Sequence, residues 1–531
     1  MIYAFQFISP ALRRHLILAT FLLAVISQLP AQLNGTYTIG GWKPDYNSIG
    51  AAVAHLNASG VTGAVTFLIR PGVYEEQITL SSVNGASKYN TITFTSESGK
   101  AADVVIRYHP TYSSGYYVLR FSGGRYYRIL NLTVESTNNY YTGVVQAYGQ
   151  ELYDILIRGC RLLAPQRDLN DRNLSVIVIG APSSKLRLHD NYIRGGTGGM
   201  SINNGISTEI TDNFIYHFGY QAVFLGGLEG GKFTGNRIIG SSRSTSPSKG
   251  VIIVQWNGTA LKPVLLANNF ISLPSSSHDA FIVSYSQHVN VYYNSVNFMG
   301  RGWGFVLRNN QFADVKNNIF KSGSTYAIDV DDCTDCEMNY NDIYTSSGPL
   351  GTYYGRIASD LQQWRLLSGQ DARSISVDPW FVSSKDLHAT SIALCRAGVL
   401  VPGVKVDIDG DLRAKPPCIG ADEFTKGLLI PYYSKSALSD DTQSYEEVDS
   451  AMSVFPNPVA KELNVMINDT YEGLVSLTVL DGLGRNVFHT DYQKKGAELR
   501  TNVGVEHLSP GVYQVRIEEG RKTSVKRFVK R

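Results

Sequence analysis

Methionine and cysteine are scarce in this chain of 531 residues, and neither sign of charge is in excess. There are 6 Met and 5 Cys, and 48 basic residues stand against 45 acidic ones, which gives a formal net charge of +3. This balance leaves no basic field of the kind that nucleic-acid binding requires, so we expect no nucleic-acid partner. The cysteines have no histidines at zinc-ligand spacing, and we predict no metal site from them.

Long apolar runs are also missing. The apolar run Leu16 to Ile26 has 11 residues, follows Arg13-Arg14-His15 and precedes Pro30-Ala31. This arrangement predicts a secretory signal peptide that is cleaved after Ala31. No later segment approaches the roughly 18 apolar residues of a membrane span, so we expect no transmembrane segment in the mature chain.

Glycine and tyrosine are abundant, at 50 and 32 residues, and asparagine recurs at a regular interval. The segment from Leu186 to Ile193 has the pattern apolar-x-apolar-x-x-Asn-x-apolar. The same pattern returns downstream with steps of 22, 23, 33, 25, 24 and 23 residues between its asparagines: Asn191, Asn213, Asn236, Asn269, Asn294, Asn318 and Asn341. Such a period indicates a repeat protein.

Each repeat contains short segments in which apolar residues alternate with period two, and this alternation predicts strands. Two or three strands in about 23 residues, stacked at about 4.8 Å per copy, make a parallel β-solenoid. Leucine-rich repeats are the alternative, but here the second half of each repeat is another alternating strand. We interpret the asparagines as architecture: their amides stack and hydrogen-bond the copies above and below, at a turn where Asn also tolerates left-handed backbone angles.

Three segments resemble parts of known β-helix proteins. Pro71-Gly72-Val73-Tyr74-Glu75-Glu76 resembles the first rung of pectin-lyase-like right-handed β-helices, which include the pectinesterases. The resemblance implies an all-β fold, a right-handed parallel β-helix. Residues 47–60 predict a helix that caps its open end. Asp378-Pro379-Trp380-Phe381 and the segment Cys418 to Phe424 look like the closing portion common to bacterial β-helix proteins.

The last 80 or so residues carry a second set of motifs. Pro456-Asn457-Pro458, Asp481-x-x-Gly484-Arg485 and Gly511-Val512-Tyr513, followed by a basic and aromatic tail, closely resemble the C-terminal sorting domain of the type IX (Por) secretion system of Bacteroidetes. This resemblance implies a small C-terminal β-sandwich and interaction with the type IX secretion machinery. It also implies a secreted protein, attached to lipopolysaccharide at the outer-membrane surface or released outside the cell.

These patterns divide the chain into six parts. We predict a signal peptide (1–31), an N-terminal cap (32–64), the β-helix (65–350), its closing segment (351–425), a linker (426–452) and the sorting domain (453–531).

Candidate catalytic residues come from the outward positions of the second strand, which we expect to align in two columns. The first is Ser201, Phe224, Ile252, Ile282, Val306 and Asp329, and the second is Asn203, Gly226, Val254, Ser284, Arg308 and Asp331. The alignment predicts that Arg308 reaches Asp331, a pair that is more often a surface salt bridge than a catalytic couple. Asp331-Asp332-Cys333 resembles the Asp-Asp-Cys of polygalacturonases, but the other motifs of that family and of the pectinesterases are absent. Arg308 with Asp329, Asp331 and Asp332 is thus the rung-aligned candidate for lyase chemistry.

Candidate binding residues are aromatic. Four apolar side chains in the first column predict an exposed patch, which usually marks a cover or a partner. Trp256, Tyr285 and Trp303 lie near expanded turns, including Ser241 to Gly250. They can stack on sugar rings or simply pack the turns onto the helix.

The cysteines of an exported protein meet oxidising conditions. Cys395 and Cys418 form the preferred disulfide, whereas Cys333 and Cys336 are either a short-loop disulfide or a reduced pair. Cys160 occupies the asparagine slot of an earlier rung and is expected to be buried.

We predict no cofactor, and the one alternative is a Ca²⁺ ion. Asp407, Asp409 and Asp411 alternate around Gly410, which suggests Ca²⁺ or a hydrogen-bonded turn. The distal Glu of a calcium loop is missing, which favours the turn.

These features predict a secreted β-helix protein that binds glycan or host-surface ligands. The alternative is a polysaccharide lyase or hydrolase that acts on an acidic polysaccharide. The fold alone does not decide whether the protein is an enzyme.

Overall fold

The computed structural model describes the chain in two units. The first comprises residues 31–240, 249–274, 278–323 and 325–424, and the second comprises 452–455, 459–468, 471–481, 486–496, 498–519 and 522–531. The predicted signal peptide, most of the turn Ser241 to Gly250, nearly all of the linker and the Pro456-Asn457-Pro458 motif lie outside the described residues. So do four residues of the Asp481 to Arg485 motif.

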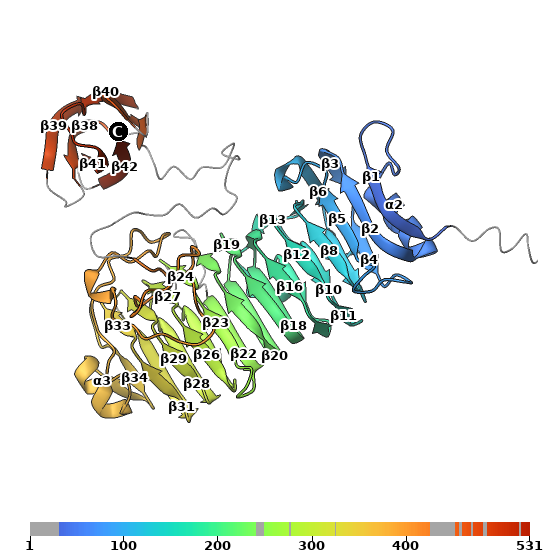
Figure 1. Cartoon of the computed structure of the whole chain (residues 1–531), viewed down its shortest axis with the longest axis horizontal. Coiled ribbons are helices and arrows are strands. Elements are labelled where there is room, and N and C mark those ends of the chain that lie inside the picture. Colours follow the sequence, from blue (N-terminus) through green and yellow to red (C-terminus); the bar gives the residue numbers. More distant parts are fainter. Residues whose placement is uncertain are drawn as a thin grey trace, which may run out of the picture. The chain divides into compact units, whose positions relative to one another are not determined.

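The first unit is a parallel β-solenoid, which confirms the predicted fold (Figure 1). One rung contains β25 (Phe281–Ser284), β26 (Val289–Tyr292) and β27 (Ser295–Phe298). Each strand pairs in parallel with its copy in the next rung, which contains β28 (Phe305–Gln311), β29 (Asp314–Lys316) and β30 (Ile319–Ser322).

The third strand of each rung contributes to an 11-stranded parallel sheet, called here the second sheet. Its strands are β3 (Gly72–Glu75), β6 (Val104–Tyr108), β9 (Thr133–Ser136), β13 (Arg161–Gln166), β17 (Tyr192–Gly196), β19 (Phe214–Tyr216), β21 (Arg237–Ile239), β24 (Phe270–Leu273), β27, β30 and β33 (Asp342–Thr345).

The remaining strands of the solenoid form a larger sheet that bends around the core. Its strands are β1 (Leu33–Ile39), β2 (Val61–Ile69), β4 (Ile78–Ser81), β5 (Ile92–Ser96), β7 (Leu119–Ser122), β8 (Tyr127–Leu130), β10 (Val145–Ala147), β11 (Leu152–Tyr153), β12 (Leu156–Arg158), β14 (Ile177–Ile179), β15 (Ser183–Ser184), β16 (Arg187–His189), β18 (Gly198–Thr211), β20 (Gln221–Thr234), β22 (Lys249–Asn257), β23 (Val264–Ala267), β25, β26, β28, β29, β31 (Ile328–Thr334), β32 (Glu337–Asn339), β34 (Gly351–Tyr353) and β35 (Arg356–Ala358).

The recurring asparagines form one buried ladder, as the sequence predicts. The side-chain Nδ2 of each asparagine from Asn191 to Asn318 donates to the Oδ1 of the next one at 2.8–3.1 Å. Cys160 fills the same slot one rung earlier, where its backbone N–H donates to Asn191 Oδ1 at 3.0 Å. The ladder ends where Asn341 Nδ2 donates to the buried Asp371 at 3.1 Å.

The left-handed backbone does not lie at the asparagines themselves. It lies at the residue before each of them: Asp190, Asp212, Gly235, Asn268, Tyr293, Asn317 and Tyr340. The reversal of the chain at this residue turns the following amide inward, so the asparagine is free to serve as a buried hydrogen-bonding group.

Helices cover both ends of the solenoid. α2 (Ile49–Ser59) confirms the helix expected over residues 47–60. Ser48 caps its N-terminus by accepting from the Ala51 N–H, and the helix buries its own Leu56 side chain. At the other end, α3 (Leu361–Ser368) buries Trp364 against Tyr353. Short 3-10 helices occur at Ala101–Asp103, Arg172–Leu174 and Ile392–Leu394.

Of the predicted closing segment, residues 351–368 form β34, β35 and α3, and residues 371–424 run back over the second sheet (Figure 1). From here on, the name closing segment refers to residues 371–424. The Ala421 N–H donates to Ser295 Oγ on β27 at 3.0 Å, and Lys321 on β30 pairs with Asp378 at 2.7 Å. The closing segment therefore covers several rungs of the second sheet, and its Val404 also packs with Ala267 of β23 and Tyr292 of β26 in the larger sheet.

The second unit is a small antiparallel β-sandwich, as predicted. One sheet contains β36 (Met452–Phe455), β37 (Glu462–Asn468) and β40 (Glu498–Gly504), and the other contains β38 (Gly473–Leu480), β39 (Asn486–Lys494), β41 (Gly511–Glu519) and β42 (Lys522–Lys530). Apolar side chains such as Leu477 and Phe528 fill the space between them. Among the described residues of both units, no helix is long and apolar enough to cross a membrane.

Candidate functional site

The predicted columns of the second strand are confirmed by the strand register, but the predicted ion pair is wrong. Arg308 is the backbone partner of Asp331, yet its Nε binds Asp329 Oδ2 at 2.5 Å. Asp329 is 3% exposed, and its other oxygen accepts a hydrogen bond from the Thr352 hydroxyl. Asp331 and Asp332 are exposed. The candidate lyase residues thus separate into a buried, fully paired carboxylate and two solvated ones, and they do not converge on one point.

The exposed apolar patch expected in the first column is not present. Ile252 and Val306 are 6% and 2% exposed, and Phe224 and Ile282 are half-buried. The Arg172 guanidinium lies 3.7 Å from the centre of the Phe224 ring. Neighbouring segments therefore cover this column already, and it offers no apolar docking surface.

The three aromatic candidates have different surroundings. Trp256 is fully buried in the core, and its indole N–H donates to the Gly230 carbonyl at 2.7 Å, so it cannot contact a ligand. Trp303 is half-buried and stacks on Tyr326 with ring centres 5.8 Å apart. Only Tyr285 of the three is exposed, at 57%.

Tyr285 lies beside a narrow outward face that the sequence did not predict. Asn257, Gln287, Gln311 and Thr334 stand on successive rungs of this face. The Gln287 N–H donates to Asn257 Oδ1 at 3.0 Å, Gln287 pairs in parallel with Gln311, and Gln311 is in register with Thr334. We call this column and its flanking residues Tyr285, His288, Asn309 and Phe312 the amide face.

The flanking residues of the amide face all have a left-handed backbone. Tyr285 and Asn309 have φ of 52° and 53°, and His288 and Phe312 have φ of 51° and 57°. Each rung therefore bends twice, once on either side of the amide column, and the bends point these side chains outward. Phe312 is 41% exposed and stacks on His288 with ring centres 4.6 Å apart.

A second, shorter ladder inside the bend holds this geometry. The Trp256 N–H donates to Ser286 Oγ, and the Ser286 N–H donates to Asn310 Oδ1, both at 3.0 Å. Asn310 Nδ2 donates to the Val283 carbonyl at 2.8 Å. The inward Ser286 and Asn310 fix the backbone next to the outward Gln287 and Gln311, so the face is preorganised.

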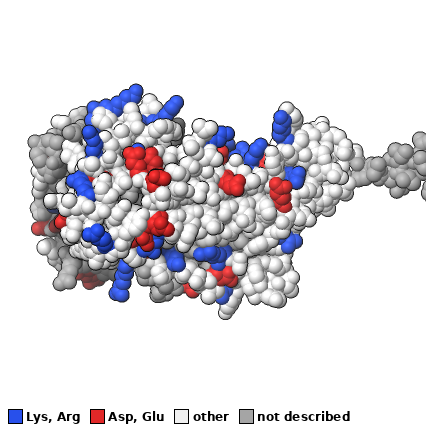
Figure 2. All heavy atoms as spheres, turned by 90° about the horizontal axis from the view of Figure 1, so that it is seen from below, with Lys and Arg blue, Asp and Glu red and all other residues white. Residues whose placement is uncertain are grey.

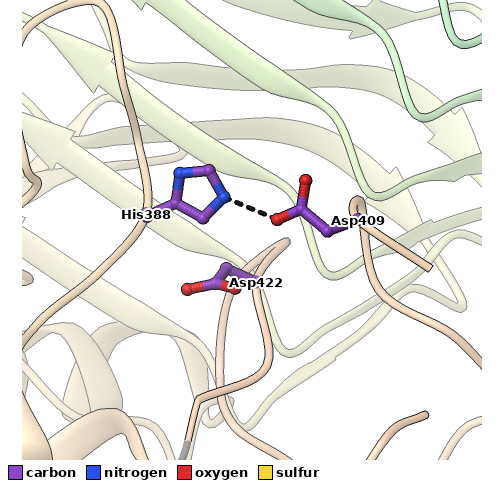
Figure 3. A group of neighbouring side chains, drawn as sticks. All are labelled: His388, Asp409 and Asp422. Atoms are coloured by element: carbon purple, nitrogen blue, oxygen red, sulfur yellow. Dashed lines mark hydrogen bonds and ion pairs between the residues drawn. The ribbon is translucent and has the colours of Figure 1, made fainter. Parts of the chain in front are cut away.

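The closing segment contains a separate polar cluster, made of His388, Asp409 and Asp422 (Figure 3). His388 Nε2 and Asp409 Oδ2 are 2.6 Å apart, and the other ring nitrogen of His388 bonds Asp386. Asp409 Oδ1 also accepts from Arg237 of β21 at 2.7 Å. The ring of Phe270 on β24 packs edge-on against the His388 imidazole, with ring centres 5.1 Å apart.

Burial and pairing act in opposite directions on these groups. Burial lowers the pKa of His388, but its hydrogen bonds to Asp386 and Asp409 outweigh this and raise the pKa from 6.5 to about 10. Burial raises the pKa of Asp422 to about 7, although the nearby His388 acts against the shift.

The Asp407 to Asp411 segment forms a hydrogen-bonded turn. Asp407 Oδ1 accepts from the backbone N–H groups of Asp409 and Asp411 at 2.9 and 2.8 Å, and Oδ2 accepts from the Glu423 N–H at 2.9 Å. The three alternating aspartates do not face one another: Asp407 serves the turn, Asp409 faces His388, and Asp411 is exposed.

The disulfide in the structure is formed by a different pair of cysteines from the pair that the sequence favoured. Cys333 and Cys336 form a disulfide, which settles the two alternatives given for them. Cys395 and Cys418 are buried free thiols, so the predicted bond between them is absent. Both thiols instead donate to the Phe424 carbonyl, at 3.2 and 3.1 Å.

The surface charge agrees with the balanced composition. On the face shown in Figure 2, basic and acidic side chains form small groups among uncharged ones, and neither sign forms a continuous field.

Comparison with known protein families identifies the second unit. The family model described as secretion system C-terminal sorting domain matches residues 453–531. The C-terminal unit is a sorting domain of this family. It indicates export by the type IX secretion system, and interaction with that machinery, to the cell surface or the extracellular space.

Solved structures similar to the chain include phage tailspike proteins. The Dettilon tailspike protein (gp208) is 8% identical, with 90% of this chain and 87% of that chain covered and a TM-score of 0.38. The enzymatically active domain of tailspike protein 2 of bacteriophage CBA120 is 10% identical, with 94% and 76% covered and a TM-score of 0.29. A search of curated protein sequences finds no match.

Proposed function

We propose that the exported β-solenoid binds an extended glycan along the amide face. The observation that carries the proposal is the combination of two exposed rings, Tyr285 and Phe312, with the exposed Gln287 and the half-buried Gln311 on consecutive rungs. Gln287 and Gln311 make no side-chain hydrogen bond within the described residues, so their donors and acceptors are available to sugar hydroxyls. Tyr285 and Phe312 offer ring faces beside them.

The geometry of the face suits a repeating polymer. Neighbouring rungs of a parallel sheet are about 4.8 Å apart, so equivalent side chains recur at a short, fixed interval along the solenoid. The ladder of Ser286 and Asn310 below the face means that little ordering entropy is lost on binding. Amides and rings without a dominant charge favour uncharged stretches of a glycan over a strongly acidic one.

Binding is favoured over catalysis because the candidate catalytic residues do not form a site. Arg308, the candidate base of a lyase, is held in an ion pair by the buried Asp329, whereas Asp331 and Asp332 are solvated and do not join this pair. Assays for reducing ends and for unsaturated products on a polysaccharide panel are expected to show no turnover, and the Arg308→Ala and Asp331→Asn variants are expected to match the wild type. Turnover by the wild type that is lost in either variant would support the alternative that the protein is an enzyme.

The test of binding is a panel of polysaccharides measured by co-sedimentation and calorimetry. Tyr285→Ala and Gln311→Ala each remove a contact worth about 1–1.5 kcal/mol, so each is expected to weaken binding about tenfold. Tyr89→Ala is the matched control, since Tyr89 is 76% exposed at the N-terminal end of the solenoid. Equal loss in Tyr89→Ala, or no loss in the two face variants, would contradict the proposal.

A further inference from the structure

We infer that His388, Asp409 and Asp422 form a binding site for one divalent transition-metal ion of the Zn²⁺ type. One ligand atom from each of the three residues can be chosen so that all lie within 4.8 Å of one another. Figure 3 shows His388 Nε2 directed at the Asp409 carboxylate, with the Asp422 carboxylate beside the ring. An ion placed among three such atoms displaces to solvent the proton shared by His388 Nε2 and Asp409 Oδ2, and it then has one imidazole nitrogen and two carboxylate oxygens as ligands.

The ligand types select the class of metal. Ca²⁺ and Mg²⁺ prefer oxygen ligands alone, whereas imidazole nitrogen together with carboxylate oxygen suits Zn²⁺ and its neighbours. Three protein ligands leave a coordination position for water, as is common for zinc outside fully closed structural sites. This site differs from the calcium alternative considered for the Asp407 to Asp411 turn, because Asp407 and Asp411 do not contribute to it.

The surroundings of the three residues match those of a metal site. A histidine that binds a metal through one nitrogen usually donates its other N–H to a carboxylate, and Asp386 occupies that position on His388. The second oxygen of Asp409 is held by Arg237 at 2.7 Å, which orients its first oxygen toward His388. Asp422 makes no hydrogen bond within the described residues, so its carboxylate is available as a ligand.

The three ligands come from separate stretches of the closing segment. His388 follows the loop near Ser384, which accepts a hydrogen bond from Ser272 of β24, and Asp409 pairs with Arg237 of β21. Asp422 follows Ala421, which bonds Ser295 of β27. An ion bound by all three would tie these stretches together over the second sheet, and it would stabilise only the folded state.

The experiment uses the full chain, freed of metal with EDTA and titrated with ZnCl₂ by calorimetry, with the melting temperature measured in parallel. We expect saturable binding of one ion and a rise in melting temperature. Asp422→Asn is expected to weaken this binding at least tenfold and to leave the melting temperature of the metal-free protein almost unchanged. Asp378→Asn is the control from the same segment, because Asp378 pairs with Lys321 and is not one of the three ligands.

Three outcomes would overturn the inference. The first is equal Zn²⁺ binding by the wild type and Asp422→Asn, which would place the ion elsewhere. The second is tighter binding of Ca²⁺ than of Zn²⁺, which would exclude the imidazole as a ligand. The third is the absence of any saturable binding, which would make the cluster a purely structural ion pair. Replacement by Co²⁺, with visible absorption that disappears in His388→Gln, would identify the nitrogen ligand directly.

Discussion

The asparagine ladder predicts a large loss of stability when a single rung is interrupted. Asn269 is fully buried, and its Nδ2 donates to the Phe233 carbonyl at 2.9 Å and to Asn294 Oδ1 at 2.8 Å. Its Oδ1 accepts from the N–H of Asn236 at 3.0 Å and from Asn236 Nδ2 at 3.1 Å. Asn269→Ala removes all four hydrogen bonds and leaves their partners buried. At about 1 kcal/mol for each net hydrogen bond, the expected loss is about 4 kcal/mol.

The matched control is Asn290→Ala. Asn290 lies on β26 in the next rung, is half-buried, and makes no side-chain hydrogen bond within the described residues. Its replacement is expected to change stability by less than about 0.5 kcal/mol. The assay is urea unfolding followed by circular dichroism, with hydrogen exchange to locate the weakened rungs. A loss below about 1 kcal/mol in Asn269→Ala, or a loss equal to that of the control, would show that the side chains of the ladder contribute little beyond the backbone pairing of the strands.

Three further perturbations test other parts of the first unit. Trp256→Ala opens a cavity in the core and is expected to lower the free energy of unfolding in urea by about 3–5 kcal/mol. A variant as stable as the wild type would show that the indole is not buried. Cys333→Ser removes the disulfide that closes a four-residue loop and is expected to lower the free energy of unfolding by about 2 kcal/mol. A reducing agent is expected to lower the stability of the wild type by the same amount and to leave that of the variant unchanged. Asp342 is fully buried with Oδ2 unpaired among the described residues, and burial raises its pKa well above 3.8. The protein therefore loses stability as the pH rises through this pKa, because the buried carboxylate becomes charged. Asp342→Asn cannot become charged, so this variant is expected to be more stable than the wild type by about 1–3 kcal/mol at alkaline pH and not at acidic pH. An equal difference in stability at both pH values would contradict the pKa shift.

The rungs could be predicted from the sequence because the repeat fixes their register. An apolar residue three positions before each asparagine and another two positions after it define two inward columns, and the strand pairing follows from stacking them. Val291 and Val296 around Asn294, for example, are both fully buried. The ladder, the buried Cys160 and the aligned outward columns all follow from this one spacing.

The binding candidates were harder to predict because the alternation breaks within the strand. Gln255 and Tyr285 have a left-handed backbone, which shifts the inward and outward sides by one residue. Trp256 therefore points into the core although the alternation predicts otherwise, and Tyr285 remains exposed at the bend. A search for such bends beside the inward Ser286 and Asn310 would have indicated the amide face.

The ion pair of Arg308 depends on a side-chain direction that strand register does not specify. Asp331 is the aligned partner but is solvated, whereas Asp329 lies in the covered column, where a buried carboxylate must be paired. The cluster of His388, Asp409 and Asp422 was missed for a different reason. Its members come together only through the path of the closing segment, which has no repeat to reveal its contacts.

The amide face and the metal cluster should behave independently, because they lie on different sheets. The amide face belongs to the bends of β22, β25, β28 and β31, whereas the cluster lies over β21 and β24 of the second sheet. Distant sites without shared contacts contribute additively. We therefore expect Asp422→Asn to bind glycan as the wild type does, and Tyr285→Ala to bind Zn²⁺ as the wild type does. Loss of both activities in either variant would mean that the closing segment and the larger sheet are coupled through the core, and that neither single-site interpretation holds.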